Sequence, residues 1–453
     1  MMIKSAMLLV FSCALSPVVG GIGLAKSGGV VLQQTRTTVT KDRNVWMWNR
    51  VENGKSLEVT VRGEVEFNDD YTEVKRISSD GSVEIRDTRE GMRRRLEIEA
   101  GQGGELIYSY FVDGRNRPYD AEARAWFAKV LDEAVTQSGL NAGPRAQKIL
   151  KERGNGGLLD EISRLQSDHV KNLYFQELFK SGSLDARSAI RASGIVAREM
   201  SSDHYKAQVL GAMPEQVLRD ETVRTAFLEA SATIKSDHYR AQIISAGLKT
   251  GNPSKDALLH ALKGVGGIDS DHYKTQVLLK VAETNLNESA IRSAFVEASS
   301  TIDSDYYRSQ ALMAVLRQGD LSQEALQSVL RSVGGISSDH YKCLVLLGVA
   351  ESSLNNDAAR SAYVEAAGTI KSDHYRAQAL SAFLTKSDRS KDALLAALKA
   401  TIGMSSDHYK AQTLLKLLGE RPEDETVRAA LIEAARTIKS DHERGRVLAA
   451  IFK

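Results

Sequence analysis

The chain has 453 residues, of which 26% are charged and 42% hydrophobic. This is the composition of a folded globular protein rather than a disordered one, and the length exceeds what a single compact core usually holds. Lys and Arg number 60 against 58 Asp and Glu, a formal charge of +2, so no global basic field exists to hold nucleic acid and we expect no nucleic-acid partner.

The N-terminus carries an apolar segment that follows Lys4 and ends in Gly23-Leu24-Ala25. Small residues at these positions are what signal peptidase reads, so the pattern predicts a secretory signal peptide over 1–25. An uncleaved membrane anchor is the alternative, because the segment is almost long enough to span a bilayer. Pro17 and the glycines favour cleavage. We therefore expect an exported protein, periplasmic or extracellular, with no membrane insertion after cleavage.

Residues 28–140 predict a small α+β unit. In "SLEVTVRGEVEF" (56–67), apolar and polar residues alternate as in a strand with one buried face, and Asn53-Gly54 before it is typical of a hairpin turn. Three further strands are predicted at "VEIRD", "RRRLEIEA" and "LIYSYFV", with Arg93 and Arg95 facing solvent. A helix predicted from Asp120 to Gly139 supplies a cover for the apolar face of this antiparallel meander.

After a linker or helix over 141–157, the segment 158–453 is an array of repeats. Ser-Asp followed by His or Tyr occurs nine times, and the Asp residues of these motifs are spaced first by 35 and then always by 34 residues. A fixed period in this range indicates a solenoid, in which each unit buries its apolar face against its neighbours. Each unit contains two amphipathic segments, the first beginning at Ser-Asp. The fold class predicted is thus α+β: a β-sheet head with a covering helix, followed by a right-handed α-solenoid of about nine helical hairpins.

The order of these elements resembles a group of uncharacterised exported bacterial proteins. The resemblance rests on "FVDGRNRPYDAEARAWFAKVL" at the end of the head, on "ILKERGNGGLLDEISRLQSDHVKNLYFQELF", and on the Ser-Asp-aromatic helix pairs. The repeats are similar to HEAT and tetratricopeptide arrays in architecture only, since the tetratricopeptide Trp-Leu-Gly-Tyr pattern is missing. Some of these bacterial proteins carry such regions beside membrane metallopeptidase or signalling modules, which implies a sensing or docking role. This chain has no metallopeptidase motif, so the resemblance transfers no activity.

The repeated Ser-Asp pairs are predicted to be helix caps. Their side-chain oxygens can accept the unpaired amide hydrogens of a first helical turn, and Asp places negative charge at the positive end of the helix dipole. The predicted caps are Ser202, Asp203, Ser236, Asp237, Ser270, Asp271, Ser304, Asp305, Ser338, Asp339, Ser372, Asp373, Ser406 and Asp407.

The sequence also has a longer period of 68 residues, because every second 34-residue repeat is alike. Lys follows the His-Tyr of one copy and Arg follows that of the next, as at Lys206 and Arg240, and the second helices alternate in the same way. Recent duplication of a pair of hairpins is the simplest explanation for this alternation.

Capping does not require the His and Tyr that follow Asp in most copies. They are candidates for a ligand-binding ladder with rungs roughly 10 Å apart, the spacing of packed helices. Such a ladder would hold a peptide, protein or extended polymer by many weak contacts, with pH dependence because histidine titrates between about pH 5 and 8. The alternative is packing, with Tyr between hairpins and Lys or Arg paired with a neighbouring Asp. The ladder residues are His204, Tyr205, His238, Tyr239, His272, Tyr273, His340, Tyr341, His374, Tyr375, His408 and Tyr409.

No catalytic, cofactor-binding or metal-ligating constellation is predicted. Rungs this far apart cannot share one zinc ion, and no His-Glu-x-x-His or Gly-x-Ser-x-Gly motif occurs. Cys343, the one cysteine outside the predicted signal, is expected to be a small buried residue. The sequence therefore favours a noncatalytic extracytoplasmic binding scaffold. A sensory or docking component of an envelope signalling system is the alternative, and a hydrolase site in the β head is a more distant one.

Overall fold

The computed structural model describes residues 35–452, apart from 43, 69, 285, 287, 319–320, 352–353, 355, 387–389 and 419–423. The predicted signal peptide over 1–25 lies outside the described residues. The chain divides into two compact units, the first ending at Ser183 and the second beginning at Leu184. Among the described residues no helix combines the length and apolar character needed to cross a membrane.

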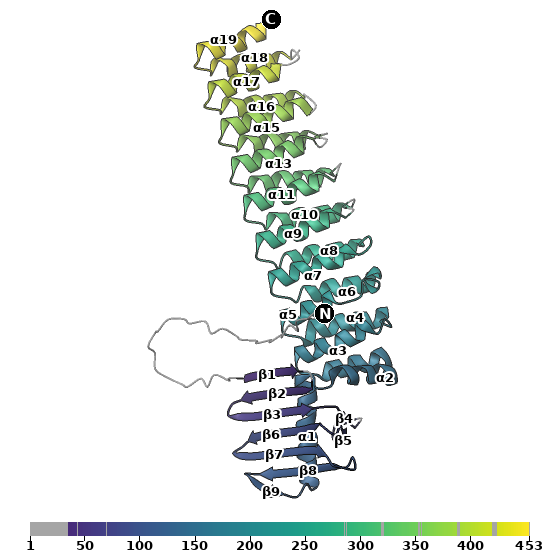
Figure 1. Cartoon of the computed structure of the whole chain (residues 1–453). Helices are drawn as coiled ribbons and strands as arrows, with labels where there is room; N and C mark the ends of the chain where they lie inside the picture. The colour runs from purple at the N-terminus through teal and green to yellow at the C-terminus, as the bar shows by residue number, and fades with distance from the viewer. Residues whose placement is uncertain are drawn as a thin grey trace, which may run out of the picture. The chain divides into compact units, whose positions relative to one another are not determined.

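The first unit is built on an antiparallel sheet of seven strands in the order β1-β2-β3-β6-β7-β8-β9 (Figure 1). The strands are β1 (Thr35–Asp42), β2 (Val45–Glu52), β3 (Lys55–Arg62), β6 (Ser82–Arg89), β7 (Met92–Ala100), β8 (Leu106–Val112) and β9 (Arg115–Arg117). The register places Trp48, Val59, Ile85 and Leu96 opposite one another across four strands, and all four are fully buried. They form the centre of the apolar face.

The predicted single strand over 56–67 is wrong. It is divided between β3 and β4 (Val65–Phe67), and β4 pairs with β5 (Val74–Ile77) in a separate two-stranded sheet. Gly63 causes the break, because its φ of +67° turns the chain and a Cβ there would lie 2.8 Å from the Cα of Gly81. The apolar residues of both parts still pack in one core, since Phe67 is buried together with Val59.

Helix α1 (Ala121–Ser138) covers the apolar face as predicted. The Asp120 side chain accepts hydrogen bonds from the backbone N–H of Glu122 and Ala123, and Gly139 ends the helix in the left-handed conformation at φ +76°. The indole N–H of Trp126 donates to Asp87 Oδ2 over 2.9 Å, in a buried contact that ties the helix to β6.

Two more helices complete the first unit. Helix α2 (Ala142–Arg164) contains a kink at Gly154, whose φ of +63° interrupts the helical backbone. Helix α3 (Asp168–Lys180) packs against α2. The segment 141–157 is therefore mostly helical, and the contacts group it and α3 with the sheet.

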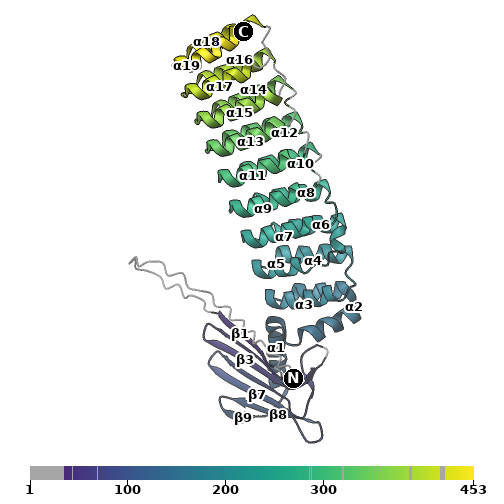
Figure 2. The same cartoon turned by 45° about the horizontal axis from the view of Figure 1, so that its top comes forward.

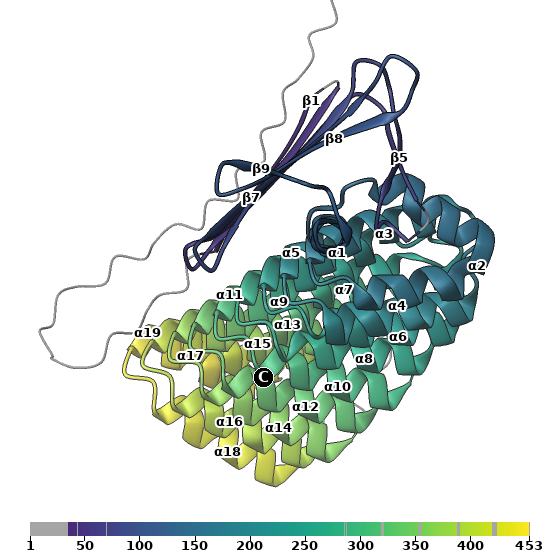
Figure 3. The same cartoon turned by 90° about the horizontal axis from the view of Figure 1, so that it is seen from below.

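The second unit is a stack of helical hairpins, and each helix packs against its counterpart in the next hairpin (Figure 2). First helices line one side and second helices the other (Figure 3). The helices are α4 (Ala186–Glu199), α5 (Asp203–Gly211), α6 (Glu221–Ser231), α7 (Asp237–Lys249), α8 (Lys255–Val265), α9 (Asp271–Ala282), α10 (Ser289–Ser300), α11 (Asp305–Leu316), α12 (Gln323–Gly334), α13 (Asp339–Glu351), α14 (Asp357–Gly368), α15 (Asp373–Lys386), α16 (Lys391–Ile402), α17 (Asp407–Leu418), α18 (Glu425–Arg436) and α19 (Asp441–Phe452), with a short 3₁₀ helix at Val217–Arg219.

The predicted helix starts are confirmed. Odd-numbered helices from α3 to α19 each begin at a motif Asp. The apolar residue two positions before each Ser is buried in every repeat, as at Ile234 and Ile302, where the side chains are fully enclosed. The architecture is thus an α+β head followed by an α-solenoid.

Candidate functional site

The motif residues recur at the first turn of each first helix, along one edge of the stack. The aspartate of each motif binds the beginning of the next repeat. Asp203 Oδ2 accepts hydrogen bonds from the backbone N–H of Lys235 at 3.0 Å and of Ser236 at 2.7 Å. Each following motif repeats this contact 34 residues further on, to Asp407, which accepts from Lys439 and Ser440. We call this contact the carboxylate clamp.

The clamp has an electrostatic signature at the last junction. The backbone N–H groups of Ser440 and Lys439 stabilise the charged form of the carboxylate and so lower the pKa of Asp407. Stabilisation of this kind is present above the ordinary pKa of an aspartate. It is lost as the pH falls through the lowered value.

The predicted capping role is corrected by this geometry. Ser202, Ser236, Ser270 and Ser304 occupy the N-cap position of four described helices, but their hydroxyl groups accept no bond from the first turn. Such a bond is present at Ser167, where Val170 N donates over 3.5 Å. In the interior of the array the serine contributes its backbone N–H to the preceding Asp, as Ser338, Ser372 and Ser406 also do. The carboxylates satisfy amides of the neighbouring repeat, while their position in the first turn keeps the predicted charge at the helix dipole.

The basic residue of the motif reaches the C-terminal end of a second helix instead of pairing with a neighbouring Asp, which corrects the packing alternative. Lys206 Nζ donates forward to Thr233 O at 3.2 Å, and Lys274 Nζ to Thr301 O at 2.8 Å. Arg240 Nε donates backward to Ile234 O at 2.6 Å. The end of α6 thus receives Lys206 from α5 of its own hairpin and Arg240 from α7 of the next hairpin.

This arrangement gives the 68-residue period a physical basis. Helices α10, α14 and α18 are followed directly by Thr-Ile, and α6 is followed by Ala232 and then Thr-Ile. The Arg copies instead precede helices that are followed by glycine, as at Gly267 and Gly335. A Cβ on Gly267 would overlap the guanidinium of Arg240, and one on Gly335 that of Arg308. The glycines therefore make room for the larger cation, so Lys and Arg cannot be exchanged without changing the helix ends around them.

The His and Tyr side chains form an unbroken series of ring contacts. From Tyr239 to Tyr409 each motif Tyr is half-buried and contacts two rings, one at the His position of its own repeat and one at the His position of the repeat before it. His204, for example, lies 5.2 Å from Tyr205 and 5.8 Å from Tyr239 between ring centroids. Most of these pairs are edge-to-face, a favourable geometry for aromatic rings. The same contacts continue through His238, Tyr273, His272, Tyr307, Tyr306, Tyr341, His340, Tyr375, His374, Tyr409 and His408.

The predicted ladder is therefore one continuous track rather than a set of separate rungs. Where Tyr306 replaces His, it keeps both contacts, at 5.1 Å to Tyr307 and 6.0 Å to Tyr341. His204 Nδ1 lies 3.1 Å from Tyr239 Oη, a hydrogen bond across the junction. The His side chains of the described copies in the second unit are exposed, from His204 to His408, so the track offers imidazoles to solvent over half-buried phenols.

The structure adds a second row that the sequence analysis missed. One helical turn after the His, a glutamine recurs, and Gln208, Gln242, Gln276, Gln378 and Gln412 are exposed. Positions four residues apart share a helix face, so this row runs beside the His track. Its signal in the sequence is the same 34-residue period, since the glutamines stand four residues after the His position of their repeats.

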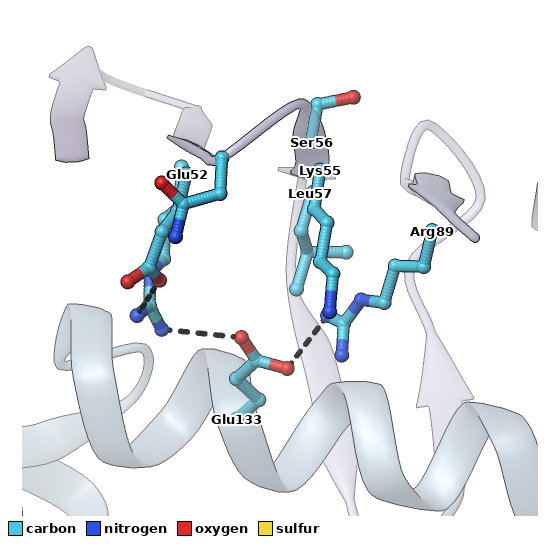
Figure 4. Close-up of a pocket in the computed structure, with 8 residues that line it drawn as sticks. Glu52, Lys55, Ser56, Leu57, Arg89 and Glu133 are labelled. Atoms are coloured by element: carbon cyan, nitrogen blue, oxygen red, sulfur yellow. Dashed lines mark hydrogen bonds and ion pairs between the residues drawn. The ribbon is translucent and has the colours of Figure 1, made fainter. Parts of the chain in front are cut away.

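The head contains an open pocket of about 340 Å³ between the sheet and α1 (Figure 4). Glu133 of α1 bridges two arginines of the sheet, with Oε1 3.3 Å from Arg50 Nη1 and Oε2 2.6 Å from Arg89 Nη2. Arg89 also pairs with Asp87 at 2.7 Å. The ion pairs that Glu133 forms with Arg50 and Arg89 join the helix to the sheet.

Metal-ligand geometry is absent from the part of the chain that the structure describes, where no three or more His, Cys, Asp or Glu side chains converge on one point. Cys343 is buried, as predicted, and burial raises the pKa of its thiol to about 11. A thiol held protonated in this way is not a nucleophile at neutral pH.

Comparison with protein-family models and with curated proteins finds no match. One solved structure, described as "Computational Design of Self-Assembling Cyclic Protein Homooligomers", is similar at 14% sequence identity. The similarity covers 61% of this chain and 92% of that chain, with a TM-score of 0.13.

Replacing Asp305 with Ala should destabilise the junction to the next repeat by about 1–2 kcal/mol, because two backbone amides lose a charged acceptor. Those amides belong to Ser337 and Ser338, at 3.0 and 2.7 Å from the carboxylate. Hydrogen exchange should accelerate there and in the first turn of α13. Asp303→Ala, which removes a nearby exposed carboxylate, serves as the control and should leave both amides protected. Faster exchange confined to the first turn of α11 would instead show that Asp305 caps its own helix.

Replacing Gly267 with Ala should destabilise the protein by about 1–3 kcal/mol in chemical denaturation, because the new methyl group displaces Arg240 from Ile234 O. Gly334→Ala is the matched control, since a Cβ on Gly334 would meet no atom within 4 Å. Arg240→Lys should relieve part of the cost in the Gly267→Ala background. Equal effects of the two glycine substitutions would contradict the steric origin of the alternation.

Proposed function

We propose that the protein is a noncatalytic extracytoplasmic scaffold that binds an extended peptide, protein segment or polymer along the His/Tyr track. The single observation that carries the proposal is the unbroken series of ring contacts, in which exposed rings, all imidazoles except Tyr306, lie over half-buried tyrosines. Packing alone accounts for the tyrosines. Contacts with the tyrosines explain why a ring stands at the His position, but they do not require that ring to be polar and exposed to solvent in nearly every repeat.

The chemistry of the track suits a ligand that repeats along its length. Imidazole has two ring nitrogens, so a nitrogen turned to the next tyrosine leaves the second to donate to, or accept from, a ligand. The parallel glutamine row adds amide groups that both donate and accept. Once one repeat is engaged, each further contact is intramolecular, so many weak contacts add up to useful affinity.

The proposed location rests on the sequence. The apolar segment before Ala25 supports export, and the resemblance to exported bacterial proteins with a β head and Ser-Asp-aromatic repeats supports the same assignment. A sensory or docking role beside an envelope signalling partner is compatible with this surface. The bound segment would then be part of that partner.

The pocket between the sheet and α1 does not favour the hydrolase alternative. Its pocket carboxylate Glu133 is engaged by two arginines that tie α1 to the sheet. A general acid or base needs a proton-exchanging group that faces a substrate. The pocket offers ion pairs instead.

The proposal predicts that His204, His272, His340 and His408 act together. Replacing all four with Ala should weaken binding to an array of unrelated extended peptides and glycans by about tenfold or more, because affinity depends on the number of intact contacts. Each single replacement should have a small effect. Circular dichroism should show unchanged helix content in all variants.

The control is His260→Ala, which removes the histidine of α8 that lies outside the motif. It should bind as the wild type does. If the quadruple variant unfolds, the histidines are packing elements. If it stays folded and binds normally, the track has no recognition role.

A further inference from the structure

The second helices carry a row of exposed side chains whose charge alternates in sign from one hairpin to the next. Its members are 34 residues apart and all exposed: Glu229, Lys263, Glu297, Arg331, Glu365, Lys399 and Glu433. They lie on α6, α8, α10, α12, α14, α16 and α18, which form one side of the stack in Figure 3, opposite the first helices that bear the His/Tyr track. We call these residues the charge row.

The first hairpin of the second unit also contributes a charge to the row, but from a residue at a different position on its helix. The equivalent position on α4 is Gly194, and a Cβ there would lie 2.7 Å from Nη2 of Arg198. The guanidinium of Arg198 therefore covers the site that the row's side chain occupies elsewhere. The sequence of charges along the row becomes positive, negative, positive, negative, and so on through eight positions.

Attraction between neighbouring members does not explain the alternation. No ion pair joins two of these side chains within the described residues; Glu229 instead lies 3.7 Å from His260, and the pairs that link adjacent second helices, such as Lys255–Glu288, sit at the helix N-termini. Helices pack about 8–10 Å apart, which is a full Debye length at physiological salt, so exposed charges on neighbouring helices are largely screened. The alternating charges of the row therefore contribute little to the attraction between neighbouring hairpins.

The pattern is complementary to itself when it is reversed. An eight-membered row that begins positive and ends negative reads, from the other end, with every sign exchanged. Two copies related by a two-fold axis in the plane of contact, parallel to the helices and between α10 and α12, would face Glu297 with Arg331 and Lys263 with Glu365. The outer members continue the match, with Glu229 facing Lys399 and Arg198 facing Glu433. A parallel arrangement would instead place each charge opposite an identical one.

We infer that this side of the solenoid is the interface of an antiparallel homodimer, centred between α10 and α12, with the charge row setting its direction. The side chains beside the row are compatible with close approach. One turn before Glu297 and Glu365 lie the small side chains Ser293, Ala294, Ser361 and Ala362, and Ser328 precedes Arg331; all are exposed or half-buried. A two-fold interface is isologous, so each central contact occurs twice.

The inference is independent of the proposed binding function. The dimer would use the second helices and leave the first helices, with their His/Tyr track, on the outer side of both copies. Two tracks running in opposite directions would then be presented by one assembly.

Sedimentation velocity of the full-length protein over a concentration series tests the inference. The wild type should approach the mass of a dimer at about 50 mM salt and dissociate as screening increases at about 500 mM. E297R would place Arg opposite Arg331 of the second copy at both symmetric contacts, and R331E would place Glu opposite Glu297. Each should weaken the dimer by about tenfold or more.

The double variant E297R/R331E restores opposite charges across the axis, so it should recover the dimer. E324R, which reverses an exposed charge on α12 outside the row, should dimerise as the wild type does. A wild type that stays monomeric at every concentration and at low salt overturns the inference. So does a double variant no better than the single ones, or a dimer that survives E297R.

Discussion

The carboxylate clamp is the interaction on which the rest of the solenoid depends. The two amides before each first helix have no intrahelical acceptor, and a buried or half-buried amide without a partner is costly. One carboxylate in the preceding repeat accepts from both, through a single oxygen as Asp203 Oδ2 does for Lys235 and Ser236, or through both oxygens as Asp305 does for Ser337 and Ser338. Because the acceptor sits in the first turn of its own helix, the contact fixes both the spacing and the register of successive helices.

That register is what brings the other motif residues together. A shift of one residue along the helix would turn the His away from the Tyr of the next repeat. With the clamp in place, His204 meets Tyr239, and Lys206 and Arg240 converge on the end of α6. The motif is thus a set of contacts across the junction between two repeats. Asp positions the next helix, Tyr and the Lys or Arg pack in the junction, and His remains at the surface.

Much of this was predictable from the sequence, because periodicity reports which positions are equivalent. It gave the helix starts at each motif Asp, the covering helix between Asp120 and Gly139, and the positions of the track. It did not give the partners of those residues.

A repeat pattern cannot tell whether Asp305 accepts from its own helix or from Ser338 of the next, since both assignments recur with the same period. The division of the strand at Gly63 and the room that Gly267 leaves for Arg240 depend on three-dimensional distances that no one-dimensional pattern contains. The continuous series of ring contacts could not be predicted either, because it depends on each His lying between the Tyr of its own repeat and the Tyr of the next.

The two sides of the solenoid follow from one physical rule, that each hairpin contacts only its neighbours. Whatever one hairpin exposes is repeated along the stack, so a single polar residue becomes a row. On the first helices the rows carry imidazole and amide groups suited to a long ligand, and on the second helices the row carries alternating charge suited to a reversed copy of itself.

Residue-resolved amide exchange of the unmodified protein tests the clamp most directly. Amides that precede a helix ordinarily exchange quickly because they have no intrahelical acceptor. If the clamp holds the repeats in register, the N–H groups of Ser236, Ser270, Ser304, Ser338, Ser372, Ser406 and Ser440 will exchange as slowly as those inside the adjoining helices. Exchange at the rate of exposed loop amides at these seven positions would contradict the account.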